Sequence, residues 1–147
     1  MADFISGMRI SSSGMSAQRA RLNTISSNIA NVNTTQTPEG GPYRRKDVVF
    51  EAMPDTRNFG EILTSSNPKS SLQRVQVSDV ISDTKAPLLK YEPDHPDANA
   101  DGYVAYPNIN MMEEMTNMIQ ATRAYEANVS AMQASKDMAL SALEIGR

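Results

Sequence analysis

The chain of 147 residues has no cysteine, no tryptophan and a single histidine, His95. Without cysteine there is no disulfide framework, no thiolate nucleophile and no cysteine-ligated zinc. One histidine excludes a metal site built from several histidines. A formal net charge of −3 argues against nucleic acid as the main partner, because phosphate backbones attract basic surfaces. The length suits one ordinary domain.

Long apolar runs and glycine-rich loops are also missing. No stretch of 18 apolar residues occurs, so no membrane span is predicted. Asp3 stands where a secretory signal would carry bases, which predicts no cleavable export signal. The glycines fit neither dinucleotide nor phosphate-loop spacing, and Ser11, Ser12 and Ser13 lack a nucleophile elbow. We therefore predict that the protein is not an enzyme and has no catalytic residue, cofactor, metal or small-molecule substrate.

One segment, residues 97–102 (DANADG), is similar to the first half of a calcium-binding EF-hand loop. The twelfth position of such a loop needs a glutamate, but Asn108 stands there. Pro93 and Pro96 also forbid the helix that should lead into the loop. A turn rich in Asp, Asn and Gly explains the same residues without metal.

Proline and methionine divide the chain into three parts. All eight prolines lie between positions 38 and 107, whereas nine of the ten methionines lie outside that range. Since proline breaks helices, we predict a mainly α-helical chain with a small β-rich middle. The predicted parts are an N-terminal helix within 1–36, a β-rich or extended segment at 37–107 and a C-terminal helix within 108–147. Short strands are predicted at 47–50, 72–77, 87–91 and 102–106.

Both ends carry apolar residues at heptad spacing, which predicts helices over about 4–33 and 108–145. Asn110 and Glu113 are spaced like a capping box at the start of the second helix. Two long amphipathic helices most simply pack as an antiparallel coiled-coil hairpin. The C-terminal helix has two predicted rows: Met111, Met118, Tyr125, Met132 and Ala139 in one, and Met115, Thr122, Val129, Lys136 and Leu143 in the other.

Two features point beyond a self-contained hairpin. Fifteen of the 26 residues at 11–36 are Ser, Thr, Asn or Gln, so this helix depends on packing for its stability. The C-terminal helix also has apolar residues outside its predicted seam, at Met112, Ile119 and Leu140. One partner helix cannot cover all of these faces, and we expect the surplus to meet other subunits.

Several segments together resemble those of a known family. Residues 13–18 (SGMSAQ) and 28–31 (NIAN) resemble the N-terminal motif of bacterial flagellar rod and hook proteins, and 118–129 (MIQATRAYEANV) resembles their C-terminal motif. Residues 41–46 (GPYRRK) and 91–108 are similar to those of the proximal rod members. The resemblance covers nearly the whole chain.

The resemblance implies a structural subunit of the basal-body rod, which serves flagellum-dependent motility. In that family the terminal helices form the innermost layer of a helical tube that passes torque from the membrane ring to the hook. Subunits leave through the flagellar type III export apparatus without signal cleavage, and their termini typically fold on assembly. The implied location is the periplasmic rod of the basal body. The implied partners are further copies, the rod proteins FlgB, FlgF and FlgG, the adaptor FliE and the membrane-ring protein FliF.

The resemblance to the rod family also implies roles for individual residues. The predicted coiled-coil and subunit contacts are Met8, Met15, Leu22, Ile25, Ile29, Met115, Met118, Val129 and Met132. The predicted polar contacts that fix register are Asn28, Asn31, Arg123, Glu126 and Asn128. Arg44 and Arg45 are expected to pair with acids of an adjacent subunit. The alternative is a monomeric or dimeric helical adaptor, or another type III-exported protein, which would keep both helices within one molecule.

Overall fold

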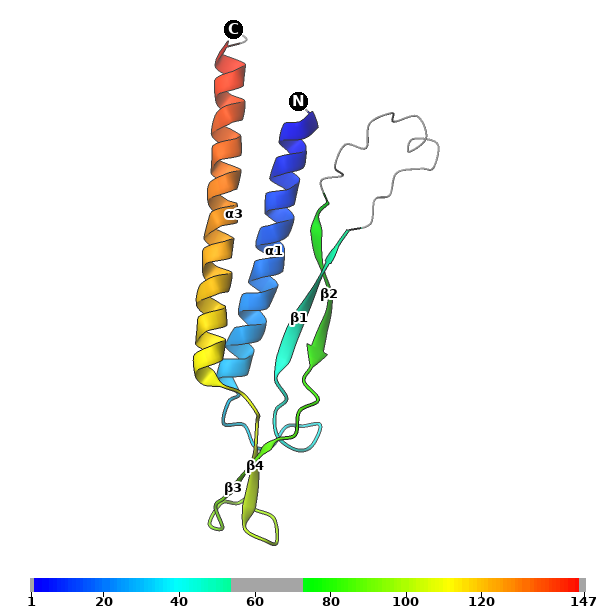
Figure 1. Ribbon diagram of the computed structural model, residues 1–147, viewed down its shortest axis with the longest axis vertical. Helices are drawn as coiled ribbons and strands as arrows, with labels where there is room; N and C mark the ends of the chain where they lie inside the picture. The colour runs from blue at the N-terminus through cyan, green and yellow to red at the C-terminus, as the bar shows by residue number, and fades with distance from the viewer. Residues whose placement is uncertain (1, 54–72, 146–147) are drawn as a thin grey trace, which may run out of the picture.

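The computed structural model describes residues 2–53 and 73–145. In these ranges the chain forms helix α1 (Ala2–Ala30), strands β1 (Lys46–Ala52), β2 (Val75–Ser82), β3 (Leu88–Tyr91) and β4 (Tyr103–Tyr106), and helix α3 (Met111–Ile145) (Figure 1). The prediction of two terminal helices with a small β region between them is confirmed. The predicted strand at 72–77 starts later and runs to residue 82; residue 72 lies outside the described ranges.

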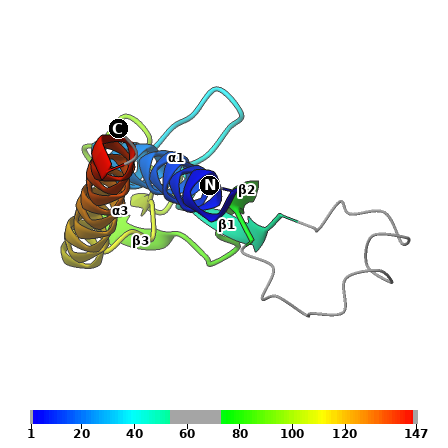
Figure 2. The same ribbon diagram turned by 90° about the horizontal axis from the view of Figure 1, so that it is seen from above.

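The two helices lie side by side and run in opposite directions, so both chain ends are at the same end of the molecule (Figure 1). Helix α3 has 35 residues and a length of about 50 Å. Helix α1 contacts α3 on one side and strands β1 and β2 on the other (Figure 2). Neither described helix has an apolar stretch sufficient to cross a membrane.

Because α1 is covered on two sides, the exposed positions among its residues 6–30 form one narrow stripe. The exposed positions recur every three or four residues and carry small or polar side chains: Arg9, Ser12, Ser16, Arg19, Asn23, Ser26 and Ala30. The polar composition of α1 is thus divided between this outer stripe and close contacts with its neighbours.

Helix α3 turns a different face toward the rest of the chain than the sequence predicted. Its less exposed positions alternate by four and three residues, and the predicted row of Met118, Tyr125, Met132 and Ala139 belongs to them, except that its first member, Met111, is 44% exposed. Of the predicted second row only Val129 is among them, since Met115 is 48% exposed and Leu143 66%. The second row of the covered face is instead Glu114, Ala121, Asn128 and Ser135.

Small and hydrogen-bonded side chains explain this choice of face. A Cβ atom added at Gly14 of α1 would lie 2.9 Å from Oδ1 of Asn128, closer than real contacts allow. The two helices therefore approach closely because position 14 has no side chain. Asn128 turns its amide nitrogen back to the carbonyl of Ala124, at 2.8 Å. Larger apolar residues such as Met115 would not fit this close approach.

The strands form two separate two-stranded antiparallel sheets. In the first, β1 pairs with β2 from Lys46↔Ser82 to Ala52↔Val75, with an irregularity between Val49 and Phe50. In the second, β3 pairs with β4 from Leu88↔Tyr106 to Tyr91↔Tyr103. The β3–β4 hairpin lies beyond the end of the helices that is opposite to the chain termini (Figure 1).

The buried core is small. Among the described residues the buried hydrophobic side chains are Ala17, Ile25, Val104, Ile109 and Ala121. Two polar side chains are buried as completely, Asn28 at 0% and Glu114 at 1% exposed. They come from the end of α1 and the start of α3, where the chain connects the helices to the strands.

Candidate functional site

Asn28, in the last turn of α1, binds the first residue of β1 and the segment that leads into it. Its Nδ2 donates to the carbonyl of Lys46 at 2.8 Å, and the Lys46 amide donates to its Oδ1 at 2.9 Å. The hydroxyl of Tyr43 donates to the same oxygen at 3.1 Å. The asparagine thus pairs with Lys46 as a neighbouring strand would, and its buried polar atoms are satisfied.

Glu114, in the first turn of α3, completes this arrangement. Its Oε2 accepts from Nδ2 of Asn28 at 3.1 Å, and its Oε1 accepts from Nε of Arg45 at 2.8 Å. Arg45 also contacts Oδ2 of Asp47 at 3.2 Å. We call Asn28, Tyr43, Arg45 and Glu114 the polar cluster. It joins α1, α3 and the segment before β1 through side chains that lie far apart in sequence.

The electrostatics of the cluster keep Arg45 charged. Its partial burial alone would lower the pKa of Arg45, but the hydrogen bonds and negative charges of Glu114 and Asp47 outweigh this, and the pKa is raised. A permanent cation is therefore present beside the buried carboxyl of Glu114. Paired in this way, the buried carboxylate is compensated, although such pairs contribute more to a unique geometry than to net stability.

The start of α3 has a second polar contact that the sequence predicted. Oδ1 of Asn110 accepts from the amide of Met112 at 3.1 Å and from that of Glu113 at 3.5 Å. Asn110 is therefore the N-cap of α3. The cap determines where the helix begins, and it places Glu114 one turn later, beside Asn28.

Of the other residues predicted to fix register, one forms a hydrogen bond at the end of α1, one packs between the helices and two are exposed. Asn31 donates to the carbonyl of Ser27 at 2.8 Å just beyond the end of α1. Asn128 packs at the close approach with α1. Arg123 and Glu126 are exposed on α3.

The two arginines expected to reach an adjacent subunit differ from each other. Arg45 takes its partners within its own chain, Glu114 and Asp47, so its assignment to a neighbouring acid is corrected. Sequence reasoning missed Glu114, because the favourable interaction of acidic side chains with the helix dipole already explains both glutamates of the first turn, Glu113 and Glu114. Arg44 is exposed and has no ion pair within the described residues.

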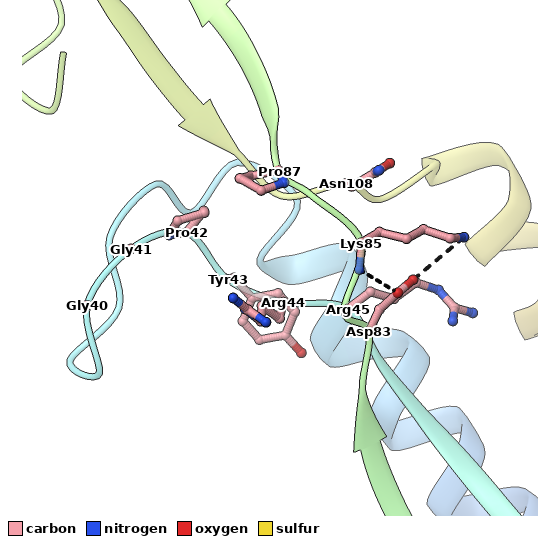
Figure 3. Close-up of a pocket in the computed structure, with 10 residues that line it drawn as sticks. All are labelled: Gly40, Gly41, Pro42, Tyr43, Arg44, Arg45, Asp83, Lys85, Pro87 and Asn108. Carbon is pink, nitrogen blue, oxygen red and sulfur yellow. Dashed lines mark hydrogen bonds and ion pairs between the residues drawn. The ribbon is translucent and has the colours of Figure 1, made fainter. Parts of the chain in front are cut away.

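Arg44 lines a small pocket between the segment at 40–45 and the chain that follows β2 (Figure 3). The cavity measures about 130 Å³, below the roughly 300–1,000 Å³ of usual ligand pockets. At its side Asp83 accepts from the backbone amide of Lys85 at 3.0 Å, which lowers the pKa of Asp83. The pocket's size fits a single side chain better than a cofactor.

The calcium-like segment forms a turn held by its own side chains. Oδ1 of Asn99 accepts the amides of Asp101 and Tyr103, and Oδ2 of Asp97 accepts the hydroxyl of Thr35 at 2.7 Å. In the part of the chain that the structure describes, no three His, Cys, Asp or Glu side chains gather as metal ligands. His95 accepts the Asp97 amide at 3.1 Å within the same turn.

A second feature that could serve a function is an uncovered face of α3. Its apolar members are exposed: Met112 by 73%, Met115 by 48%, Ile119 by 55%, Leu140 by 50% and Leu143 by 66%. They recur at heptad positions about 100° around the helix from the covered face. Between them lie Thr122, Glu126, Gln133 and Lys136, which are also exposed. We call these nine residues the α3 stripe. Such an apolar row at heptad spacing is typical of a helix that has a second helical partner.

Comparisons with known proteins cover both ends of the chain and nearly all of its length. A family model described as flagella basal body rod protein matches residues 8–36, and one described as flagellar basal body rod FlgEFG protein C-terminal matches 100–145. The flagellar basal-body rod protein FlgC of Borreliella burgdorferi is 44% identical over 146 residues, with 95% of each chain covered. The proteins of the same name from Bacillus subtilis and Escherichia coli are 42% and 38% identical and cover 95% and 94% of this chain, and 96% and 94% of their own.

These relatives are named as rod proteins, and the names indicate no catalytic function. Identity this high over nearly the full length of both proteins extends to the helices, the strands and the segments between them. The chain belongs to the FlgC family of flagellar basal-body rod proteins.

Proposed function

We propose that this chain, a structural subunit of the flagellar basal-body rod, polymerises through its terminal helices into the drive shaft that carries torque from the membrane ring to the hook. The observation that carries the proposal is the α3 stripe. After α1 has packed against α3, a complete heptad row of α3 still has no partner among the described residues. Apolar side chains exposed in such a row do not stabilise a monomer, and they mark a surface that contacts another subunit.

The energetics support a helical partner for the stripe. Its five apolar side chains are about half to three-quarters exposed. Covering what remains of each would stabilise an assembly by roughly 1 kcal/mol per side chain, or about 5 kcal/mol per copy before the cost of association. Repeated along a polymer, this contribution is sufficient to hold subunits whose individual contacts are modest.

The polar cluster supports the mechanical part of the proposal. It fixes the end of α1 to the start of α3 and to the segment before β1, through hydrogen bonds of 2.8–3.1 Å. A drive shaft needs helices that do not slide past each other under torsion. Buried polar pairs specify one register, because any slip leaves them without partners.

The proposed roles of the other predicted residues follow from the resemblance to the rod family. We infer that the coiled-coil seam includes Met8, Met15, Leu22, Ile25, Ile29, Met118, Val129 and Met132. Met115 was also predicted to belong to the seam, but it is 48% exposed and lies in the α3 stripe. Exposed Arg44, Arg123 and Glu126 would contact neighbouring subunits. The proposed neighbours are further copies, FlgB, FlgF and FlgG along the rod, and FliE and FliF at its base. Export would use the flagellar type III apparatus without signal cleavage, which places the assembled chain in the periplasmic rod.

A substitution in the stripe tests the proposal. Ile119→Glu places a charge on an exposed position, so the isolated chain should keep its helix content and melting temperature. In a bacterium that has this variant as its only copy of the protein, rods should fail to assemble and motility should be lost. Gln120→Glu, on the next residue of the same helix but outside the stripe, is the matched control and should leave both unchanged.

The alternative is the helical adaptor that functions as a monomer or dimer. It gains support if Ile119→Glu supports normal rods and motility. Loss of rods with Gln120→Glu as well would mean that any added charge on α3 is harmful, and the stripe would lose its special role. Circular dichroism of both purified variants separates these outcomes from simple misfolding.

A further inference from the structure

A groove lies between α1 and β2, away from the contact between the two helices. Its volume is about 650 Å³, and its wall includes the apolar side chains of Met53, Val75 and Val77 beside serine hydroxyls of α1. Arg9 and Arg74 also line it, and both are exposed. Neither guanidinium has an ion pair in the ranges 2–53 and 73–145. We call this the α1–β2 groove.

The β3–β4 hairpin carries a surface of the opposite kind. One face presents Leu89 and Tyr91, which are 66% and 63% exposed, and Tyr103, which is 42% exposed. The two tyrosine rings meet edge to face with centroids 5.3 Å apart. The turns beside them carry Asp94 and Asp101, exposed and without a cation partner in the described chain.

The two surfaces match in charge and in chemistry. The groove has two arginines and the hairpin two aspartates that form no ion pair within residues 2–53 and 73–145. On both surfaces these charges are accompanied by apolar side chains that a partner would cover. Arginine is favoured next to tyrosine rings as well as next to carboxylates, so both components of the hairpin suit the groove. Tyrosine and arginine are also enriched among the residues that dominate protein interfaces.

We propose that the β3–β4 hairpin of one copy docks into the α1–β2 groove of a second copy. This inference rests on the proposed function, because it needs a chain that assembles with itself. The groove is bordered by the first half of α1 and the start of β2, while the hairpin lies at the opposite end of the long axis (Figure 1). A contact between different surfaces of two copies continues from copy to copy and does not close into a two-fold dimer.

Because the chain has no cysteine, any disulfide between two copies in a cross-linking test must join the introduced cysteines. One variant carries Ser12→Cys in the groove and Ala100→Cys at the hairpin turn, both at exposed positions. Basal bodies containing it as the only copy should give a ladder of dimers and larger species on mild oxidation. The control pairs Ala100→Cys with Asn23→Cys, which is exposed on α1 outside the groove, and should give no ladder.

The outcomes separate this contact from the proposed function. Normal rods with no ladder would refute the docking and leave polymerisation intact, and a cross-link to a different protein would refute the second copy as the occupant. If the unsubstituted chain were never found in basal bodies, the proposed function itself would be refuted.

Charge reversal gives an independent test if the cysteine variant does not assemble. Arg74→Glu should weaken self-association of the purified chain about tenfold at low salt, because an attraction becomes a repulsion. Adding Asp101→Arg should restore it. Arg19→Glu, on the exposed stripe of α1 outside the groove, is the control and should change it little. Equal effects of Arg74→Glu and Arg19→Glu, or no rescue by Asp101→Arg, would overturn the inference.

Discussion

Replacing Asn28 by alanine should destabilise the chain much more than replacing Asn23, the other asparagine of α1. The side chain is 0% exposed and takes part in four hydrogen bonds: two with the Lys46 backbone, one with Tyr43 and one with Glu114. Alanine removes both its donor and its acceptor at once. Each of the four groups that were bonded to Asn28 then loses that one hydrogen bond.

The size of the effect follows from what is left without a partner. Each buried polar group that loses its hydrogen bond costs about 1–3 kcal/mol. Glu114 keeps its bond to Arg45 at 2.8 Å and Tyr43 keeps Ser27 at 3.2 Å, so the main loss falls on the amide and carbonyl of Lys46. We expect a decrease of about 3 kcal/mol in the free energy of unfolding, a large fraction of the 5–15 kcal/mol typical of a domain.

The assay is urea unfolding of the purified chain, followed by circular dichroism, with Asn23→Ala as the matched control. Asn23 is on the same helix but exposed, so its replacement should change stability by less than about 0.5 kcal/mol. Asn28→Asp keeps the shape but places a second carboxylate beside Glu114, which raises the pKa of the new group. Its stability should therefore rise again as the pH falls through that raised pKa. Equal midpoints for Asn28→Ala and Asn23→Ala would refute the role of the cluster.

Three further predictions concern other contacts. Gly14→Ala should cost about 1–3 kcal/mol, because its Cβ would lie 2.9 Å from Oδ1 of Asn128, and thermal unfolding should show a smaller loss when Asn128→Ala is combined with it. Gly102→Ala should destabilise the β3–β4 hairpin by about 1–2 kcal/mol, since φ is +78° there, and the local amides should then exchange hydrogen faster. Hydrogen bonds from Lys90 and Tyr106 lower the pKa of Glu92, so Tyr106→Phe should raise that pKa toward its ordinary value in an NMR titration, whereas an unchanged pKa would exclude the 2.8 Å bond from Tyr106. The stability that Glu92 contributes is present above its unfolded pKa and is lost as the pH falls through the lowered one.

Much of the fold could be predicted from local patterns. The exclusion of proline from both ends and the heptad spacing of apolar residues were sufficient to predict two terminal helices. Asn110 was identified as a cap because a short polar side chain before a helix satisfies its first amides. These features depend on residues near each other in sequence, so they can be read without knowing what packs against them.

The face of α3 that packs could not be predicted in this way. Two adjacent heptad rows are available on α3, and hydrophobicity favours the row of Met115 and Leu143. The structure covers the row of Glu114 and Asn128 instead, because Gly14 allows a close approach there and Asn28 and Arg45 satisfy the buried glutamate. These partners are 69 to 114 residues away in sequence, so no local pattern contains them.

The sequence by itself determined that this chain has helical ends, a β-rich middle and membership in a rod family, because these properties reside in composition, spacing and motif. Tertiary structure alone decided which polar groups are buried together, which arginine is used internally and which helix face is left for a partner. Burial of a charge depends on finding its counter-charge in three dimensions. For Glu114 that counter-charge is Arg45, and their pairing leaves the apolar stripe of α3 outside.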